Sequence, residues 1–263
     1  MMDYGLISII MPSWNCGRFV EESILSILAQ TYTNWELLFQ DDCSTDETRG
    51  IVLEYASKDA RIKYECNSKN SGAAITRNNA IKRVKGRWIA FLDSDDLWMP
   101  NKLEKQVRFM QENNYVFSYT EYQEINEQSE FLGVNVSGPK KITKLGMYAY
   151  CWPGCLTVMY DVNIVGPLEI ADIKKNNDYA MWLQIINKTD CYLLPEVLAQ
   201  YRKREGSISR QSYFKLIKWH YKLFREADNK SVFIAMLLTC FNLCFGVLKK
   251  VFYVSKNDKD EYI

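Results

Sequence analysis

Short apolar segments alternate with amphipathic helical segments over the first 119 residues, and this alternation constrains the fold more than any other feature of the sequence. The pattern is typical of consecutive β–α–β units that build a mostly parallel sheet. Helical spacing is clear in the first intervening segment, where Val20, Ile24 and Ile27 recur. The predicted strands cover residues 6–11, 35–39, 62–65, 88–92 and 115–119.

The length and charge of the chain narrow the classes of protein to which it can belong. Its 263 residues are enough for one large domain with an appendage. The 33 Lys and Arg residues nearly balance 32 Asp and Glu residues, so no overall positive field favours nucleic acid as a partner. The eight cysteines lack the paired spacing of a zinc site, which favours reduced thiols in a cytosolic protein. The N-terminus carries neither a basic region nor a cleavage site, and we expect a core strand there rather than a signal sequence.

Three carboxylates, those of Asp93, Asp95 and Asp96, follow the fourth predicted strand within four consecutive residues. Ligands bind at the carboxyl ends of strands in open α/β sheets, so the sequence places these acids at the binding edge. Carboxylates in this spacing suit a hard divalent cation that also holds phosphate oxygens. On the residues alone, a solvated turn or a helix N-terminus is the alternative.

Polar loops also end the first three predicted strands, at residues 13–17, 41–46 and 67–72. We expect them to gather at the same edge and to form a nucleotide-sized crevice. In the second loop, Ser44 and Glu47 have the spacing of a capping box that starts the next helix.

The capping box would leave Asp41 and Asp42 facing the crevice, where their carboxylates can accept hydrogen bonds from a base or a ribose. In the third loop, Asn70 and Gly72 belong to a glycine-dependent turn, and Arg77 follows. Arg77 lies near the nucleotide or is a surface residue of a helix.

The middle of the chain is less regular. Residues 120–150 are polar and weakly patterned, which predicts hairpins or a mobile flap. A strand is expected at 156–160, a helix at about 178–187 and a last strand at 197–201, before a basic loop from Arg202 to Arg210.

The C-terminal part contains an uncharged segment from Ser231 to Leu248, followed by Lys249 and Lys250. Its length is borderline for a helix that spans a membrane. The flanking bases suit the headgroups of an anionic leaflet, so contact with the membrane surface is the favoured interpretation. Packing on the domain and spanning of the membrane are the two alternatives.

Four segments occur in a familiar order and at familiar spacings. They are residues 7–15 (ISIIMPSWN), 41–46 (DDCSTD), 70–78 (NSGAAITRN) and 91–96 (FLDSDD), with further matches at 30–36 (QTYTNWE), 98–100 (WMP) and Tyr201-Arg202. Through them the chain resembles glycosyltransferase family 2 over about residues 6–210. The resemblance implies the GT-A fold, with a Rossmann-like, mostly parallel central sheet flanked by helices and a C-terminal helical appendage.

The resemblance also implies a division of the chain. Residues 1–210 would form the catalytic domain, with a nucleotide-sugar half at about 1–119 and an acceptor half at about 120–210. Residues 211–263 would form a helical segment that associates with the membrane.

The family implies a UDP-sugar donor and a saccharide or polyprenyl-linked saccharide acceptor. Asp42 would contact the uracil, Pro12 and Asn15 would line the nucleotide pocket, and Asp93 and Asp95 would lie near the ribose and metal. The other expected donor-binding residues are Ser13, Asp41, Asn70, Gly72, Arg77, Ser94 and Arg202. Mn²⁺ or Mg²⁺ would bind Asp95 or Asp96, with Asp96 as the leading ligand.

An inverting transfer needs a general base that takes the proton of the acceptor hydroxyl. Asp178, in the sequence NNDYAMWL, resembles the family's acid at the start of an acceptor-side helix. From the residues alone, the alternative is an acid that only favours the helix N-terminus. The cations from Arg202 to Arg210 would oppose the phosphate charge or face a membrane.

We therefore expect an inverting, metal-dependent transferase at the inner face of the cell membrane, acting in surface polysaccharide assembly. It would add a single sugar, because the Gln-x-x-Arg-Trp segment of processive members is missing. A nucleotidyltransferase would need a Gly-rich basic signature that residues 12–17 lack. A nucleotide-sugar-binding scaffold without turnover is the second alternative.

Overall fold

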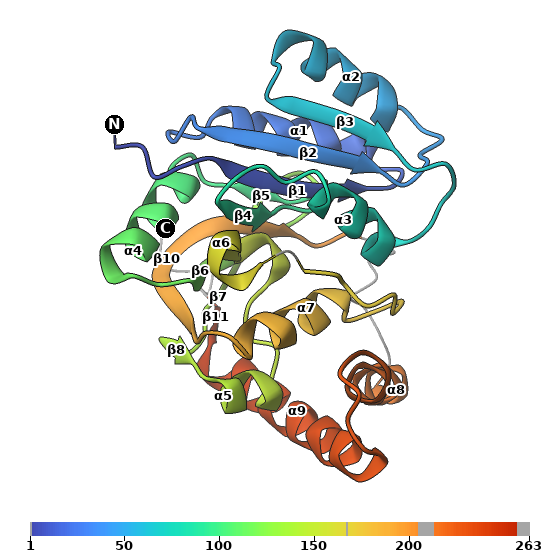
Figure 1. The fold of residues 1–263 in the computed structure, drawn as a ribbon, viewed down its shortest axis with the longest axis vertical. Coiled ribbons are helices and arrows are strands. Elements are labelled where there is room, and N and C mark those ends of the chain that lie inside the picture. The colour runs from blue at the N-terminus through green and yellow to red at the C-terminus, as the bar shows by residue number, and fades with distance from the viewer. Residues whose placement is uncertain (1, 167, 205–212, 257–263) are drawn as a thin grey trace, which may run out of the picture.

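Four parallel strands in the spatial order β4–β1–β2–β3 form the first half of the central sheet (Figure 1). The computed structural model describes residues 2–166, 168–204 and 213–256. The elements of this half are β1 (Ile7–Ser13), α1 (Gly17–Leu28), β2 (Trp35–Asp41), α2 (Thr48–Lys58), β3 (Ile62–Cys66), α3 (Ala73–Ile81) and β4 (Trp88–Phe91). Every residue of β1 and β2 is buried, because helices cover both faces of the sheet.

Successive side chains of β1 enter two different hydrophobic clusters, one on each face of the sheet. Ile9 packs into a cluster with Val20 of α1. Ile10 packs into the other cluster, which contains Phe91 and Trp182. The sheet is therefore the middle layer of the molecule, and its loops are left free to form a site at one edge.

Antiparallel strands extend the sheet beyond β4 in the order β9–β6–β7–β11, while β10 pairs in parallel with β6. The elements are β5 (Leu97–Trp98), α4 (Lys102–Asn113), β6 (Phe117–Ile125), β7 (Phe131–Val136), β8 (Lys141–Ile142), α5 (Lys144–Ala149), η1 (Cys155–Thr157), β9 (Met159–Asp161), α6 (Val162–Val165), α7 (Asn177–Ile186) and β10 (Cys191–Arg202). The predicted α/β class is confirmed, with parallel strands from β1 to β4.

Three predicted strands have different ends in the structure. β6 continues to Ile125 because it pairs with β7, and this hairpin confirms the hairpins expected within residues 120–150. β10 begins at Cys191 rather than at residue 197, because its first residues pair with β6 and β8. A short 3₁₀ turn occupies the start of the strand expected at 156–160, so β9 begins at Met159.

The C-terminal elements pack against α5, α7 and β7. They are α8 (Tyr213–Lys222), the π-helical turn η2 (Leu223–Ala227), α9 (Val232–Phe252) and β11 (Val254–Lys256). Leu223 and Phe224 are fully buried in the same cluster as Trp182. β11 then pairs antiparallel with β7, so the chain returns to the sheet after α9.

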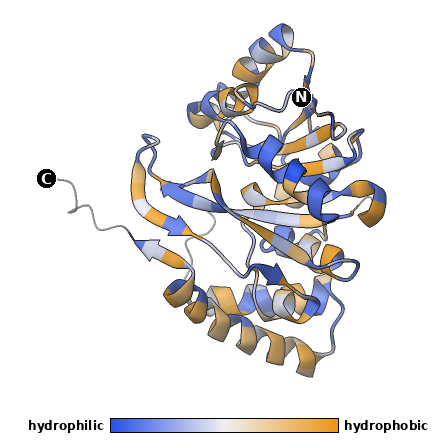
Figure 2. Ribbon diagram, turned by 90° about the vertical axis from the view of Figure 1, so that its left-hand side faces the viewer, coloured by the Kyte–Doolittle hydropathy of each residue, from blue (hydrophilic) through white to orange (hydrophobic). Residues whose placement is uncertain are grey.

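α9 has a mixed inner face, with polar and apolar residues, and an apolar outer face. Its buried residues are Ala235, Thr239 and Asn242, and a side chain at Gly246 would meet the Tyr150 ring at 3.1 Å. The exposed apolar residues are Val232, Phe233, Ile234, Met236, Leu237, Phe241, Val247, Leu248, Val251 and Phe252. Figure 2 shows this helix as a mostly hydrophobic band along the lower edge of the molecule. By length and composition it could cross a membrane.

Candidate active site

The loops that follow β1, β2 and β4 are joined by hydrogen bonds at one edge of the sheet. The N–H of Asn15 donates to Ser44 Oγ at 2.9 Å, and Asn15 Oδ1 accepts from the N–H of Thr45 at 2.8 Å. The Cys16 thiol donates to the carbonyl of Ser94 at 3.2 Å. The predicted gathering of polar loops at this edge is therefore present.

Asp41 holds the loop after β2. One carboxylate oxygen accepts from the N–H and hydroxyl of Ser44, at 2.9 and 2.6 Å, and the other accepts from Tyr64 Oη at 2.8 Å. Asp41 is only 1% exposed and does not face the crevice as expected. The capping box predicted for Ser44 and Glu47 is wrong, because α2 begins at Thr48 and the Ser44 hydroxyl binds Asp41 instead.

Asp42 connects the loop after β2 with the turn before α3. Its carboxylate accepts from the N–H groups of Ser71 and Gly72, at 2.7 and 2.8 Å, and from Asn67 Nδ2 at 2.8 Å. Gly72 has a φ of 86°, a backbone conformation that favours glycine and that turns both N–H groups toward Asp42. Asp42 thus shapes the turn, and its contact with uracil stays a prediction.

Three other predicted donor-binding residues lie around this turn and the end of β1. Pro12 and Ser13 are buried in β1, whereas Asn70 is exposed. Within the described part of the chain, the buried Ser13 hydroxyl has no hydrogen-bond partner. A buried hydroxyl without a partner needs an explanation, and a bound ligand that accepts its hydrogen bond would supply one.

Arg77 joins two segments that are far apart in the sequence. From α3, its Nη2 donates to Asp93 Oδ1 at 2.5 Å, and its Nη1 donates to Asn177 Oδ1 at 2.8 Å. Arg77 is 7% exposed, which excludes the alternative of a surface residue. Although burial opposes its charge, the Asp93 and Asp178 carboxylates hold the pKa of the Arg77 guanidinium above its usual value.

Asp178 lies in the first turn of α7, one residue beyond the Arg77 contact. Asn176 before it has a left-handed backbone, and the Asp178 carboxylate accepts from the N–H of Tyr179 at 2.8 Å. Asp178 is half-buried. Burial raises its pKa above the usual value for aspartate, Asp93 adds to the rise, and Arg77 and the Tyr179 N–H oppose it. A raised pKa suits a carboxylate that must take a proton near neutral pH.

The three acids after β4 occupy different environments. Asp93 is partly exposed beside Arg77, and the Asp95 carboxylate pairs with Arg204 Nε at 2.6 Å. Asp96 is only 2% exposed, and its Oδ1 accepts from the N–H of Arg202 at 2.8 Å. Burial and the neighbouring Asp95 and Asp93 raise the pKa of Asp96 well above its usual value. Burial also raises the pKa of Asp95, although the Arg204 charge opposes this, so the choice between Asp95 and Asp96 as metal ligand stays a prediction.

Arg202, which we expected to contact the donor phosphates, has a structural role instead. Its guanidinium is fully buried and lies 4.9 Å from the ring of Phe19. Its N–H groups donate to Glu22 Oε2, Ser129 Oγ and the carbonyls of Asp95, Asn126 and Glu127. Arg204 of the basic loop pairs with Asp95, and residues 205–212 of that loop lie outside the described residues.

Asp93 and Asp95 fit a divalent cation that completes its coordination with substrate. Within the described residues, no three His, Cys, Asp or Glu side chains are arranged to hold a metal ion. Mg²⁺ and similar hard ions commonly bind through one or two carboxylates together with substrate phosphates and water. Asp93, Asp95 and Asp96 supply carboxylates of this kind, and the metal site itself stays a prediction.

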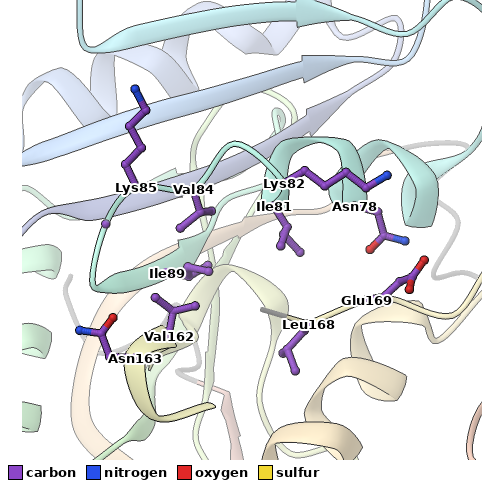
Figure 3. Close-up of a pocket in the computed structure, with 11 residues that line it drawn as sticks. Asn78, Ile81, Lys82, Val84, Lys85, Ile89, Val162, Asn163, Leu168 and Glu169 are labelled. Carbon is purple, nitrogen blue, oxygen red and sulfur yellow. The ribbon is translucent and has the colours of Figure 1, made fainter. Parts of the chain in front are cut away.

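A cavity of about 670 Å³ lies apart from these carboxylates, between α3 and the segment around α6 (Figure 3). Asn78 at its edge exchanges two hydrogen bonds with the backbone of Ile170, at 2.9 and 2.8 Å. Its wall includes Lys82, Lys85 and Glu169, and none of the predicted catalytic or metal-binding acids. The candidate active site is therefore at the strand ends and not in this cavity.

Comparison with known proteins gives the family. The Glycosyl transferase family 2 model matches residues 8–150. The Escherichia coli enzyme WfgD is 44% identical over 217 residues, which cover 82% of this chain and 84% of that protein. The chain belongs to glycosyltransferase family 2. The resemblance inferred from the sequence is confirmed, and the alternative of a nucleotidyltransferase is set aside.

Solved structures confirm the fold expected for a family 2 member. Staphylococcus aureus TarS, residues 1–349 in complex with UDP-GlcNAc, superposes with a TM-score of 0.70 at 20% identity, covering 90% of this chain and 71% of that one. The mannosyltransferase PcManGT from Pyrobaculum calidifontis, in complex with GDP-Man and Mn²⁺, gives 0.64 at 15% identity, covering 92% and 75%. The central sheet and its flanking helices are thus GT-A-like.

Proposed function

We propose that this family 2 glycosyltransferase moves one sugar, with inversion, from a UDP-sugar to a saccharide carried on a polyprenyl diphosphate, in surface polysaccharide assembly. The observation that carries the proposal is the junction at Arg77, which holds Asp93 of the nucleotide half next to the start of α7 in the acceptor half. The name of WfgD, a UDP-Glc:alpha-D-GlcNAc-diphosphoundecaprenol beta-1,3-glucosyltransferase, supports both substrate classes.

In the proposed reaction, Asp178 accepts the proton of the acceptor hydroxyl as the new glycosidic bond forms and the bond to the UDP leaving group breaks. Arg77 stabilises the charged form of Asp178, and Asn177 fixes the guanidinium. Asp93 and Asp95 would hold Mn²⁺ or Mg²⁺, which would neutralise charge on the departing diphosphate. Transfer from a panel of UDP-sugars to a synthetic GlcNAc diphospholipid, followed by mass spectrometry, tests this function. UDP binding without any product would instead support the scaffold alternative.

Asp95→Ala and Asp96→Ala are expected to affect different properties, ligand binding in the first case and stability in the second. Asp95→Ala should abolish Mn²⁺-dependent UDP binding and leave the free energy of unfolding nearly unchanged, because the ion pair that it removes is with the partly exposed Arg204. Asp96→Ala should mainly lower stability, by about 1–3 kcal/mol, because the N–H of Arg202 loses its buried acceptor. Calorimetry with UDP, with and without Mn²⁺, and urea unfolding of both variants measure the two effects. Loss of metal-dependent binding only in Asp96→Ala would restore Asp96 as the ligand.

We infer that α9 lies on the cytoplasmic membrane surface. The outer face is apolar, the helix contains no acidic residue, and Lys249 and Lys250 are at its end. Both ends of α9 connect to elements of the same domain, since η2 is buried in the core and β11 pairs with β7. A spanning helix would place its ends on opposite sides of the bilayer, so the packing favours a helix in the plane of the membrane.

Replacement of Phe233, Leu237 and Phe241 together by glutamine should reduce binding to phosphatidylglycerol vesicles at least about tenfold. These side chains are 66, 44 and 53% exposed, so their loss removes membrane contacts and little of the core. Sedimentation with vesicles measures the binding, and UDP affinity serves as the check on folding. Leu53→Gln, on α2 at the other end of the molecule, is the control and should bind normally. Unchanged sedimentation of the triple variant would contradict the membrane role.

A further inference from the structure

Lys249 is a cation on the inner face of α9, directed toward the domain. Its Nζ donates to the carbonyl of Trp152 at 3.2 Å and lies 5.4 Å from the centre of the Tyr150 ring. Among the described residues, no carboxylate forms an ion pair with it. A lysine ammonium has three N–H donors, and one hydrogen bond to a carbonyl leaves its charge without a counter-ion in direct contact. Burial lowers the pKa of Lys249, while Cys151 and the Glu124 carboxylate oppose the shift.

The inner face of α9, which carries Lys249, also contacts the helix of the candidate base. Asn242 lies on this face, and its Nδ2 donates to Tyr179 Oη at 2.8 Å. Tyr179 follows Asp178 in the first turn of α7. On the outer side of α9, Val251 is exposed. The inner face of α9 thus meets the helix of Asp178, and its outer face is apolar.

We propose that Lys249 binds the diphosphate of the lipid-linked acceptor, with the sugar directed toward Asp178 and the lipid toward the outer face of α9. The proposal rests on the proposed function and deepens it, because it names the anionic group that the acceptor site recognises. A diphosphate supplies the contacting counter-charge that Lys249 lacks. It also joins a sugar to an apolar chain, which matches a helix whose inner face meets α7 and whose outer face is apolar. Gly246 contributes by letting α9 approach Tyr150 closely enough to bring Lys249 to Trp152.

The test compares Lys249→Gln with Lys250→Gln in the full chain. Glutamine can still donate to the Trp152 carbonyl but carries no charge, and Lys250 is an exposed neighbour with the same charge. The two acceptors are GlcNAc linked to a short alkyl chain through a diphosphate, and the same sugar on the same chain as a simple glycoside. We expect Lys249→Gln to raise KM for the diphosphate acceptor about 10- to 100-fold and to leave KM for the glycoside unchanged. Lys250→Gln should change neither value by more than about twofold.

Equal effects on the two acceptors, or no effect on either, would overturn the proposal and leave Lys249 as a structural tie to Trp152. Lys249→Arg retains the charge and should restore the preference for the diphosphate acceptor, which keeps the test decisive if the glutamine variant is unstable. Calorimetric UDP binding confirms that each variant is folded. Failure of the unmodified enzyme to transfer to either acceptor, despite UDP binding, would refute the proposed function itself, a result distinct from a missing effect at Lys249.

Discussion

Asp178→Asn is expected to lower kcat about 10²- to 10⁴-fold and to leave UDP affinity unchanged. Asparagine is nearly isosteric but cannot accept the proton of the acceptor hydroxyl, and general bases contribute a factor of this size. The loss should therefore appear in single-turnover transfer and not in calorimetric donor binding. Because the structure raises the pKa of Asp178, activity of the unmodified enzyme should fall with decreasing pH at values above the usual range for aspartate.

The sign of this pH dependence follows from the role of the residue. A base acts only when it is deprotonated, so activity is retained above the raised pKa and is lost as the pH falls through it. Asp172→Asn is the matched control, because Asp172 is an exposed carboxylate shortly before α7. Its kcat and pH profile should equal those of the unmodified enzyme. Normal turnover of Asp178→Asn would mean that another group is the base.

Arg202→Met is expected to lower the free energy of unfolding by about 3–5 kcal/mol. The substitution removes every hydrogen bond of a fully buried guanidinium and leaves the carbonyls of Asp95, Asn126 and Glu127 without these donors. Methionine fills part of the volume, so the loss arises mainly from unsatisfied polar groups. Urea unfolding followed by circular dichroism measures it.

Arg204→Met provides the comparison, because Arg204 is also a cation near the acids but is about one-third exposed. Its ion pair with Asp95 should contribute no more than about 1 kcal/mol to stability. If Arg202→Met instead unfolded like the unmodified protein and bound UDP poorly, Arg202 would have the phosphate-binding role that its sequence context first indicated.

The sequence was sufficient to predict the fold and the elements that carry the site. The alternation of apolar and helical segments predicted the parallel half of the sheet. This was possible because β1 and β2 are buried on both faces, and their residues are therefore mostly apolar. The order of the motifs then indicated the family, and the resemblance predicted that Asp93, Asp95 and Asp178 belong to the site. In the structure Arg77 joins Asp93 to Asn177, the residue before Asp178, and these two contacts could not be predicted from its own segment.

The errors arose where contacts of the folded chain decide the role of a side chain. Ser44 has the spacing of a helix cap, but Asp41 lies three residues earlier at the end of β2, and the hydroxyl binds there instead. Arg202 stands at the start of the predicted basic loop, and the pairing of β10 with β6 brings its side chain to the carbonyls of Asn126 and Glu127. The partners of Arg202 are set by strand register, which local spacing does not encode.

The orientation of α9 relative to the sheet is fixed, because the chain returns to the sheet through β11. A terminal amphipathic helix on a single tether could rotate and tilt freely, but α9 is held by the buried turn η2 at one end and by a strand pair at the other. If its outer face rests on a bilayer, the height of Asp178 above the headgroups becomes a constant of the fold. The enzyme would then select lipid carriers by the distance between the membrane surface and the sugar. It would accept only carriers in which this distance matches the height of Asp178.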